Sequence, residues 1–482
     1  MKNKTKAKAL KKDPLVPLRN GDPITGAQSV LMILKLSIPA ILAHISGIIM
    51  QYIDASMVGK LGADQSASIG LVSSSTWLLN GICIASSVGF TVQIANKIGA
   101  KDEKSARNTA KLGIVFTTLL GVFVALLGIS IGFYLPEWLG GDESIRDNAS
   151  AYFIICTTAM PLTMINHTCA GMLQCSGNMK IPGILDITMC VLDVIFNFFL
   201  IFPTRNITVF SHNIIVPGAG MGVAGAALGT SLAFSVTGLI MLYFLMFRSD
   251  SLKFRKGERL KFNSTVIKNA LKISVPVAIE EILTCGAHIA FTKIVAPLGN
   301  AAIAANSFSI TAESLCYMPG FGVATAATTI IGQSLGAKRY DMAKRLSRLT
   351  LAFGMLLMTV TGVLMYIFAP QMLALITPDP QIIELGTGAL RIEAFAEPMF
   401  AAAIVCSGIF RGAGDTAITG IIAFISMWLI RIPLAVMLVG DAGLSGAWLA
   451  MCIEICARGA LFIVLLFTRF KRRTEKQLYK VF

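Results

Sequence analysis

Charged side chains are scarce in this chain, and motifs that would indicate catalysis are missing. Asp, Glu, Lys and Arg make up 14% of the 482 residues, whereas a soluble protein carries about 25%. The sequence contains no nucleotide-binding P-loop and no HExxH metal motif. Its ten cysteines lie mostly in apolar segments and show no metal-ligand spacing. We therefore expect no enzyme activity, no bound cofactor and no nucleotide-driven pump.

The chain is instead rich in long, nearly uncharged segments, each reaching the ~20 residues that a helix needs to cross a bilayer. Helix is expected because open strands cannot satisfy their backbone groups in lipid. The predicted fold class is an all-α polytopic membrane protein with twelve transmembrane helices. The segments lie near 33–58, 67–93, 108–135, 149–173, 181–203, 220–247, 266–292, 301–331, 345–369, 384–409, 417–440 and 443–468.

Positive charge outweighs negative charge, with a formal net charge of +15. Its placement argues against a nucleic-acid partner, because Lys and Arg gather at both termini and in every second connecting loop. The intervening loops are poor in base, as in the acidic stretch "EWLGGDESIRD" at Glu137–Asp147. This is the positive-inside pattern. It predicts a multi-pass protein of the cell inner membrane, in contact with the lipid bilayer and with both termini in the cytoplasm.

The sequence contains two copies of one unit. At an offset of 237 residues, "LKLSIP" (Leu34–Pro39) matches "LKISVP" (Leu271–Pro276), and "GAK" at Gly99 matches "GAK" at Gly336. The offset later falls to 221 because the first copy has an insertion, "TRNITVFSHNIIVPGAG". The predicted division is a basic N-terminal tail at 1–30, an N-lobe at 31–247, a cytoplasmic linker at 248–265, a C-lobe at 266–468 and a basic C-terminal tail at 469–482.

Each copy holds six predicted spans, so both copies keep the same orientation in the membrane. We therefore expect two six-helix lobes related by a parallel pseudo-two-fold repeat. In transporters of this plan the substrate site lies near the bilayer midplane at the repeat interface, and one lobe rocks against the other. A two-lobe transporter is thus favoured over a channel, a receptor or an intramembrane enzyme.

Several motifs resemble those of the multidrug and toxic compound extrusion (MATE) transporters. They are "DASMVGKLG" in the first span, "VGFTVQIANKIGAKDEKSA" after the second, "GMLQCSGNMKIP" after the fourth, "PGFGVATAATTIIGQSLGAKRYDMAKR" after the eighth and "GIFRGAGDTAITG" after the tenth. The resemblance covers essentially the whole chain, from about Leu34 to Arg469. It implies a V-shaped pair of six-helix lobes and export of organic, often cationic compounds, driven by inward flow of Na⁺ or H⁺.

Ionisable residues inside membrane spans usually face a cavity or one another, and the N-lobe has several. Asp54 interrupts the apolar first span, and its counterpart in the second copy is Phe291, so the symmetry of the fold does not require a carboxylate there. Asp193 and Asn197 are four residues apart and therefore share one helix face. Oxygen ligands of this kind suit Na⁺, whereas the same carboxylates could instead carry a proton.

The resemblance points to the same helix positions for cation or proton coupling. Asp54 matches the first-span aspartate of the family, Asp193 the fifth-span aspartate of one bacterial branch, and Thr230 a sixth-span threonine. That branch usually has an asparagine one turn before its fifth-span aspartate, where this chain has Met189. If the transporter is sodium-coupled, the candidate ligands are Asp54, Asp193 and Asn197. The alternative role for either aspartate is a structural hydrogen bond between helices.

The C-lobe has acids of its own, which are candidates for a substrate cavity or a second acid site. Glu280 and Glu281 lie one turn beyond Pro276. Because adjacent helical residues diverge by ~100°, we expect one to face the cavity and the other a neighbouring helix. The remaining C-lobe candidates are Glu313, Glu397 and the aromatic Tyr317.

Further residues of this lobe have structural alternatives. Glu393 stacks with Glu397 at four-residue spacing and is either a further acid of this group or a solvated residue that pairs with Arg391 near the outer surface. Glu454 is expected to pair with Arg458 one turn along its own helix. Trp448, like Trp138, is interpreted as an interfacial anchor.

The favoured function is a secondary antiporter that exports organic, cationic or amphipathic compounds, with Na⁺ or H⁺ as the coupling ion. We expect the protein to act as a monomer. The alternative is a flippase or an exporter of a lipid-linked or metabolite substrate on the same two-lobe fold. Flippases of that kind carry a strongly cationic cavity, whereas the charges within these spans are mainly acidic.

Overall fold

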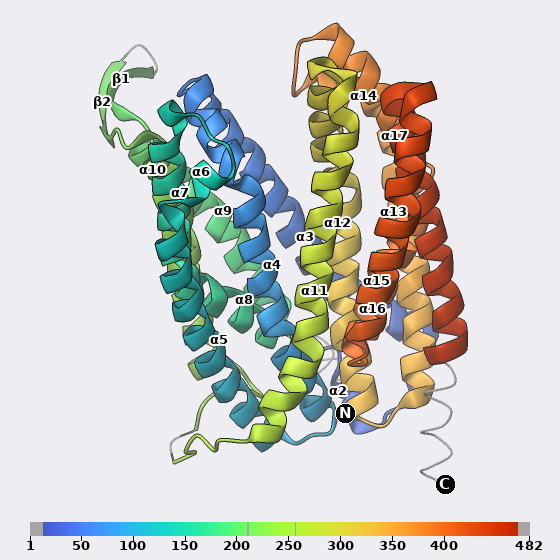
Figure 1. Cartoon of the computed structure of the whole chain (residues 1–482). Coiled ribbons are helices and arrows are strands. Elements are labelled where there is room, and N and C mark those ends of the chain that lie inside the picture. The colour runs from blue at the N-terminus through green and yellow to red at the C-terminus, as the bar shows by residue number, and fades with distance from the viewer. Residues whose placement is uncertain (1–12, 210–211, 256, 471–482) are drawn as a thin grey trace.

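The computed structural model describes residues 13–209, 212–255 and 257–470, so most of the two predicted tails lies outside the described residues. Helices make up nearly all of the described chain, as the sequence predicts. Figure 1 shows two helical bundles side by side, one formed by the first half of the chain and the other by the second. The bundles lean apart toward the end of the molecule that carries a small β-hairpin.

The first bundle begins with a short segment and continues through long helices. Its helices are α2 (Val16–Asn20), α3 (Gly26–Gly59), α4 (Ala63–Gly99), α5 (Glu103–Gly132), α6 (Leu135–Trp138), α7 (Glu143–Thr158), α8 (Met160–Cys175), α9 (Lys180–Leu200) and α10 (Gly222–Tyr243), which a π-helical turn extends over Phe244–Arg248.

The second bundle follows a linker and has the same order of long helices. Its helices are α11 (Ser264–Val295), α12 (Asn300–Gly336), α13 (Tyr340–Ala374), α14 (Pro380–Glu393), α15 (Glu397–Gly412), α16 (Thr416–Ser426) and α17 (Ile432–Leu465). A 3-10 turn over Ala296–Leu298 follows α11, and π-helical turns over Met427–Arg431 and Leu466–Phe470 flank α17.

Membrane-spanning helices dominate both bundles. Within the described residues, nine helical segments are long and apolar enough to cross a bilayer, or eleven when two bent helix pairs are each taken as one span. The bent pairs are α7 with α8, at 48°, and α14 with α15, at 61°. The chain is therefore a multi-pass membrane protein.

The last apolar segment, Thr416–Phe470, is 55 residues long and doubles back on itself. Gly443 has φ 55° and ψ −136°, a conformation outside the helical region. Arg431 Nη2 lies 2.6 Å from Glu454 Oε2, although 23 residues of straight helix would separate them by about 34 Å. The ion pair therefore requires the chain to reverse direction between these two residues.

The insertion in the first copy forms a β-hairpin, which corrects the expectation of a purely α-helical fold. Strand β1 (Pro203–Val209) pairs antiparallel with β2 (His212–Ala219), with a register irregularity between Pro203 and Arg205. The Arg205 guanidinium lies over the rings of Phe198 and Phe202, at 4.4 and 4.1 Å from their centroids. Backbone hydrogen bonds between the strands, together with these stacked rings, hold the insertion at the end of α9.

The two bundles meet most closely near the end where the chain termini lie in Figure 1. A Cβ added at Gly99, at the end of α4, would lie 2.2 Å from the backbone oxygen of Gln333 in α12. A Cβ at Gly336, at the end of α12, would lie 2.0 Å from the backbone oxygen of Asn96 in α4. Only glycine permits this approach, and these are the two matched positions of the "GAK" repeats.

The segment before α3 also joins the bundles, so part of the region predicted as a tail is packed. Leu15 and Leu18 are completely buried in a cluster with Ala326 and Met342 of the second bundle. Arg19 donates from Nε to Gln333 Oε1 at 2.8 Å and from Nη2 to the backbone oxygen of Ser176 in the first bundle at 2.9 Å. One guanidinium therefore bridges both halves of the molecule.

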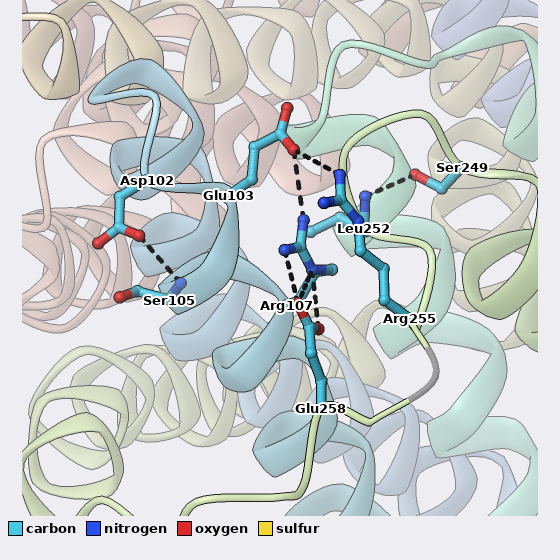
Figure 2. A network of polar contacts seen from close by, with 8 residues as sticks. All are labelled: Asp102, Glu103, Ser105, Arg107, Ser249, Leu252, Arg255 and Glu258. Carbon is cyan, nitrogen blue, oxygen red and sulfur yellow. Dashed lines mark hydrogen bonds and ion pairs between the residues drawn. The ribbon is translucent and has the colours of Figure 1, made fainter.

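The linker between the bundles is docked against α5 (Figure 2). Arg107 donates from Nη2 and Nε to Glu258, at 2.7 Å to Oε1 and 2.9 Å to Oε2, and also contacts Glu103 at 3.3 Å. Arg255 of the linker lies 3.6 Å from the same Glu103. Arg107 is 4% exposed, so Glu258 supplies the partner that this buried cation needs.

Trp448 is not an interfacial anchor, contrary to the interpretation from sequence. Its side chain is completely buried, and its indole N–H donates to Asn306 Oδ1 at 3.0 Å. Trp138 is 67% exposed. The difference arises because Trp448 follows the reversal at Gly443, which turns its helix face into the second bundle.

Substitution of Gly336 tests the close contact between α4 and α12. Gly336→Ala is expected to destabilise the protein by about 1–3 kcal/mol, because the new methyl group overpacks against the Asn96 carbonyl. The measurement is thermal unfolding in detergent. Gly70→Ala is the control, because a Cβ there meets nothing within 4 Å; equal melting temperatures for the two variants would contradict the packing.

Linker docking is expected to depend on pH through Glu258. The Arg107 guanidinium holds the pKa of the Glu258 carboxyl below its usual range. A carboxyl whose pKa is lowered in the folded protein stabilises the docked linker at any pH above its unfolded pKa of about 4.3. This stabilisation is lost as the pH falls through the lower pKa of the folded state.

Limited proteolysis checks this pH dependence. Glu258→Gln is expected to speed trypsin cleavage at Arg255 and Arg259 at pH 7, whereas wild type becomes cleavable in the linker by pepsin near pH 3. Glu137→Gln, which removes a charge from α6, outside the linker, is the control. An unchanged trypsin pattern for Glu258→Gln would show that this carboxylate does not hold the linker.

Candidate functional site

The polar side chains predicted in the N-lobe converge between α3 and α9. Asp54 lies on the second half of α3, an otherwise apolar helix. Asp193 and Asn197 lie one turn apart on α9, and both are completely buried. The four-residue spacing places their side chains on the helix face that packs against α3.

The Asn197 amide joins the two carboxyl groups. Its Nδ2 donates to Asp54 Oδ1 at 2.8 Å and to Asp193 Oδ2 at 3.1 Å. Asp193 Oδ1 and Asn197 Oδ1 are buried without a hydrogen-bond partner in the described structure. The site therefore has two oxygen atoms free to bind a further donor or a cation.

Helix α10 closes the site with small and hydroxylated residues. A Cβ at Gly229 would lie 2.1 Å from Asn197 Oδ1, so the absence of a side chain leaves room for the asparagine. The next residue, Thr230, places its hydroxyl beside the Asp193 carboxyl group. Thr230 was predicted from the resemblance, whereas the spatial requirement at Gly229 was not.

Tyr152 of α7 is a site residue that the sequence did not reveal. Its phenol lies close enough to both Asp54 and Asp193 for a direct electrostatic interaction. Tyr152 is 41 positions from Asp193 and 98 from Asp54 along the printed sequence, and no periodicity connects them. Only the packing of α7 against the other helices brings it there.

Two facing carboxyl groups with one shared amide donor are suited to bind a positive species. If both were ionised they would repel each other, so a proton or a cation between them is favourable. The described residues contain no group of three His, Cys, Asp or Glu side chains arranged to hold a metal ion. Any cation would therefore be bound by two carboxyls together with amide and hydroxyl oxygens.

The C-lobe contains a second group of buried acids, formed by Glu313 of α12, Glu393 of α14 and Glu397 of α15. Their exposed fractions are 4%, 0% and 0%. All four carboxyl oxygens of Glu393 and Glu397 lack a hydrogen-bond partner in the described structure. The interpretation of Glu393 as a surface residue paired with Arg391 is therefore wrong; Arg391 instead lies over the ring of Tyr366.

The adjacent pair on α11 diverges, as helical geometry predicts. Glu280 accepts a hydrogen bond from Thr419 at 2.9 Å and lies 3.4 Å from Arg411 Nη2, both within the C-lobe. Glu281 points the other way, toward α4 of the first bundle. A Cβ added at Gly81 of α4 would lie 3.1 Å from the Cβ of Glu281. Glu281 therefore lies where the two bundles meet, whereas Glu280 pairs with Arg411 and Thr419 inside the C-lobe and has a structural role.

Tyr317 lies beside the C-lobe acids within an aromatic group. Its ring centroid is 5.3 Å from that of Phe400 and 6.1 Å from that of Phe321. Glu313 and Glu397 lie near enough for their charges to act on its phenol. The group thus combines apolar walls with acidic side chains.

Glu454 differs from Glu313, Glu393 and Glu397 because it forms ion pairs with two arginines. The predicted pair with Arg458 is present, with Nε at 3.1 Å from Oε1. Arg431 also donates to Oε2, from Nη2 at 2.6 Å and from Nε at 2.9 Å. The role of Arg431 was not predicted from the sequence, although an arginine within an apolar segment was itself a signal.

Comparison with known proteins identifies a family signature in both halves of the chain. The sequence model of one family, MatE, matches residues 39–199 and 276–437. The two matches begin at Pro39 and Pro276, which are separated by the offset of the internal repeat.

Curated relatives match over most of their length. A "Probable multidrug resistance protein NorM" of Thermotoga maritima is 27% identical over 432 residues, which cover 89% of this chain and 90% of the relative. A "Probable multidrug resistance protein YoeA" of Bacillus subtilis is 24% identical over 429 residues, which cover 88% and 89%.

Solved structures share the fold. An outward-facing multidrug resistance MATE family transporter of the MOP superfamily has a TM-score of 0.84 at 20% identity, covering 92% of this chain and 96% of that one. A MOP superfamily transporter from Pyrococcus furiosus, described by a reverse polarity of its binding pocket, has a TM-score of 0.84 at 19% identity, covering 93% and 99%. At this identity the likeness shows the fold alone.

Two isosteric substitutions separate paired from unpaired acids in the C-lobe. Glu454→Gln is expected to destabilise the protein by about 3–5 kcal/mol, because two buried arginines lose their shared counter-charge. Glu393→Gln is expected to keep or raise stability, because its carboxyl oxygens have no hydrogen-bond partner to lose. Thermal unfolding in detergent measures both; a larger loss for Glu393→Gln would reverse the assignment.

Proposed function

Because the chain belongs to the MatE family, we propose that it is a secondary antiporter that exports organic cations or cationic amphipaths in exchange for Na⁺ or H⁺. The observation that carries the proposal is the group of Asp54, Asn197 and Asp193, in which one amide donates to both carboxyl groups while Asp193 Oδ1 and Asn197 Oδ1 lack a partner. Such a group is suited to bind a small cation or a proton. Packing of the helices does not require that both Asp54 and Asp193 be charged. The names of the multidrug resistance relatives support the substrate class.

The proposed topology has twelve spans, with both termini in the cytoplasm of the inner membrane. The reversal between Arg431 and Glu454 supports two spans within Thr416–Phe470. Adding one span to the eleven gives twelve. The basic connecting loops support a cytoplasmic location for the end of the molecule at which Gly99 and Gly336 meet.

The proposed mechanism is alternating access, in which the lobes rock about their contact. Helix α3 carries Asp54 and also packs on the other lobe, since a Cβ at Gly322 of α12 would lie 2.6 Å from the backbone nitrogen of Ile41. His44 and Phe321 continue this contact, with ring centroids 6.3 Å apart. A cation or proton that draws α3 toward α9 would therefore shift a helix on which the opposite lobe rests.

The C-lobe acids are proposed to receive the cationic substrate or a second coupling ion. Glu313 and Glu397 lie near enough to the Tyr317 phenol for their charges to act on it, and a positive charge is attracted both to carboxylates and to ring faces. Glu281 is a further candidate at the meeting of the lobes. The acidic character of these residues favours export of cations over a flippase for a lipid-linked pyrophosphate, which would need basic residues.

Removal of the Asp54 charge tests the coupling site. Asp54→Asn is expected to abolish resistance to cationic drugs in a susceptible host, with at least a tenfold fall in efflux rate, while the amount of protein in the membrane stays unchanged. Asp64→Asn is the matched control, because Asp64 is an exposed aspartate at the start of α4. Full resistance in the Asp54 variant would rule out the proposed role.

Transport in proteoliposomes identifies the coupling ion. An inward-directed Na⁺ gradient and an inward-directed pH gradient are imposed separately, and efflux of a small panel of cationic dyes is followed. Dependence of efflux on one gradient, lost in Asp54→Asn, supports antiport through the N-lobe site. Efflux that persists without either gradient would refute secondary antiport.

A further inference from the structure

A basic groove lies between the start of α3 and the start of α13, away from the sites described above. Its volume is about 440 Å³. Val30 and Leu349 provide apolar walls, and the charged lining residues are Asp341, Lys344, Arg345 and Arg348. We call it the α3–α13 groove.

The groove carries more positive than negative charge. Its single carboxylate, Asp341, lies 3.4 Å from Arg339. Arg345 donates to the backbone oxygen of Ile24 at 3.0 Å, and Arg348 lies over the ring of Phe467, 5.0 Å from its centroid. Among the described residues, neither Arg345 nor Arg348 forms an ion pair, and both are exposed. Two guanidinium groups therefore remain available to an anion from outside the chain.

The internal repeat shows how the first copy treats the equivalent surface. By the offset of 237, Arg348 corresponds to Lys111 on α5. Lys111 Nζ donates to the backbone oxygen of Glu258 at 2.7 Å and lies over the Phe254 ring, so the linker covers this part of α5. Figure 2 shows the same linker bringing the Glu258 carboxylate to Arg107. On α13 no acidic side chain of the described chain contacts Arg345 or Arg348.

The apolar helix surfaces beyond the groove indicate what kind of anion fits. On α3, Ile38 lies two turns beyond Val30 and is 49% exposed. On α13, Leu356 lies two turns beyond Arg348 and is 66% exposed. Because eight helical residues turn through about 800°, each of these exposed residues lies within about 80° of the groove residue on its own helix, so the groove continues into an apolar surface. This combination matches a headgroup joined to acyl chains.

We propose that the α3–α13 groove binds the phosphate headgroup of an anionic phospholipid, with its acyl chains along α3 and α13. In the orientation proposed above, the groove lies at the cytoplasmic leaflet, where basic pockets between membrane helices bind anionic headgroups. Arg345 and Arg348 contact the phosphate, and Val30 contacts the glycerol and upper acyl region. A lipid held here would brace α3, the helix that carries Asp54, against the C-lobe.

Lipid titration of purified full-length protein tests the proposal. Phosphatidylglycerol and phosphatidylcholine with identical acyl chains are added in detergent, and bound lipid is counted by native mass spectrometry. Wild type is expected to bind phosphatidylglycerol preferentially. Arg345→Gln together with Arg348→Gln is expected to weaken this binding roughly 30-fold, since each basic residue near an anionic surface contributes about 1 kcal/mol.

Matched variants separate a specific site from general charge attraction. Lys104→Gln with Lys268→Gln removes two exposed cations from other helices and is expected to keep wild-type binding. Arg345→Lys with Arg348→Lys keeps the charge and is expected to retain most of the affinity. Equal losses in the Lys104/Lys268 and Arg345/Arg348 glutamine variants, or equal binding of the two lipids by wild type, would overturn the proposal.

Two further measurements fix the location and the source of the phosphate. Tryptophan introduced as Val30→Trp is expected to be quenched by spin-labelled phosphatidylglycerol more than by the labelled choline lipid, after subtraction of the signal of the four native tryptophans. Inorganic phosphate is expected not to displace the lipid at equal concentration. Equal quenching by both lipids, or displacement by phosphate, would overturn a lipid site.

Discussion

Every charge buried in this protein must find a partner within the chain or attract one, because hydrocarbon surrounds the bundles and supplies no water. Glu454 satisfies this constraint with two arginines, and Arg107 satisfies it with two glutamates. The Asp54 group satisfies it incompletely, since among the described residues no Lys or Arg forms an ion pair with either of its carboxyl groups and two oxygens of the group lack donors. The difference between complete and incomplete pairing distinguishes the structural charges from those available to a mobile ion.

The two copies of the repeat have the same order of long helices, but their buried acids lie at different positions. Glycines at matched positions let α4 and α12 approach each other at one end of the molecule. The charged residues do not follow this symmetry, because Phe291 occupies the position equivalent to Asp54. Phe291 is 2% exposed within the C-lobe core. Packing therefore fixes the relation of the lobes, while each lobe presents its own set of acids to the interior.

Local signals in the sequence were sufficient for the helical membrane fold, the repeat and the pairing of Asp193 with Asn197 on one helix face. They were insufficient where a contact depends on distant segments. Tyr152 reaches the aspartates only through packing, and Glu393 is buried only because α14 bends against α15. The hairpin was visible as an insertion, but its strands depend on a backbone pairing that no apolar periodicity reveals.

The bridge made by Arg19 has a consequence for biosynthesis. Its partner Gln333 lies 314 residues further along the chain, so this early segment has no completed docking site until α12 has been synthesised. Leu15 and Leu18 likewise wait for Ala326 and Met342. Membrane helices can insert in order as they emerge, but the cluster that ties the lobes together cannot close before α12 and α13 have emerged. Leu15, Leu18 and Arg19 thus reach their folded positions only after the first helices of the second bundle have been made, and their burial reports contact between the two lobes.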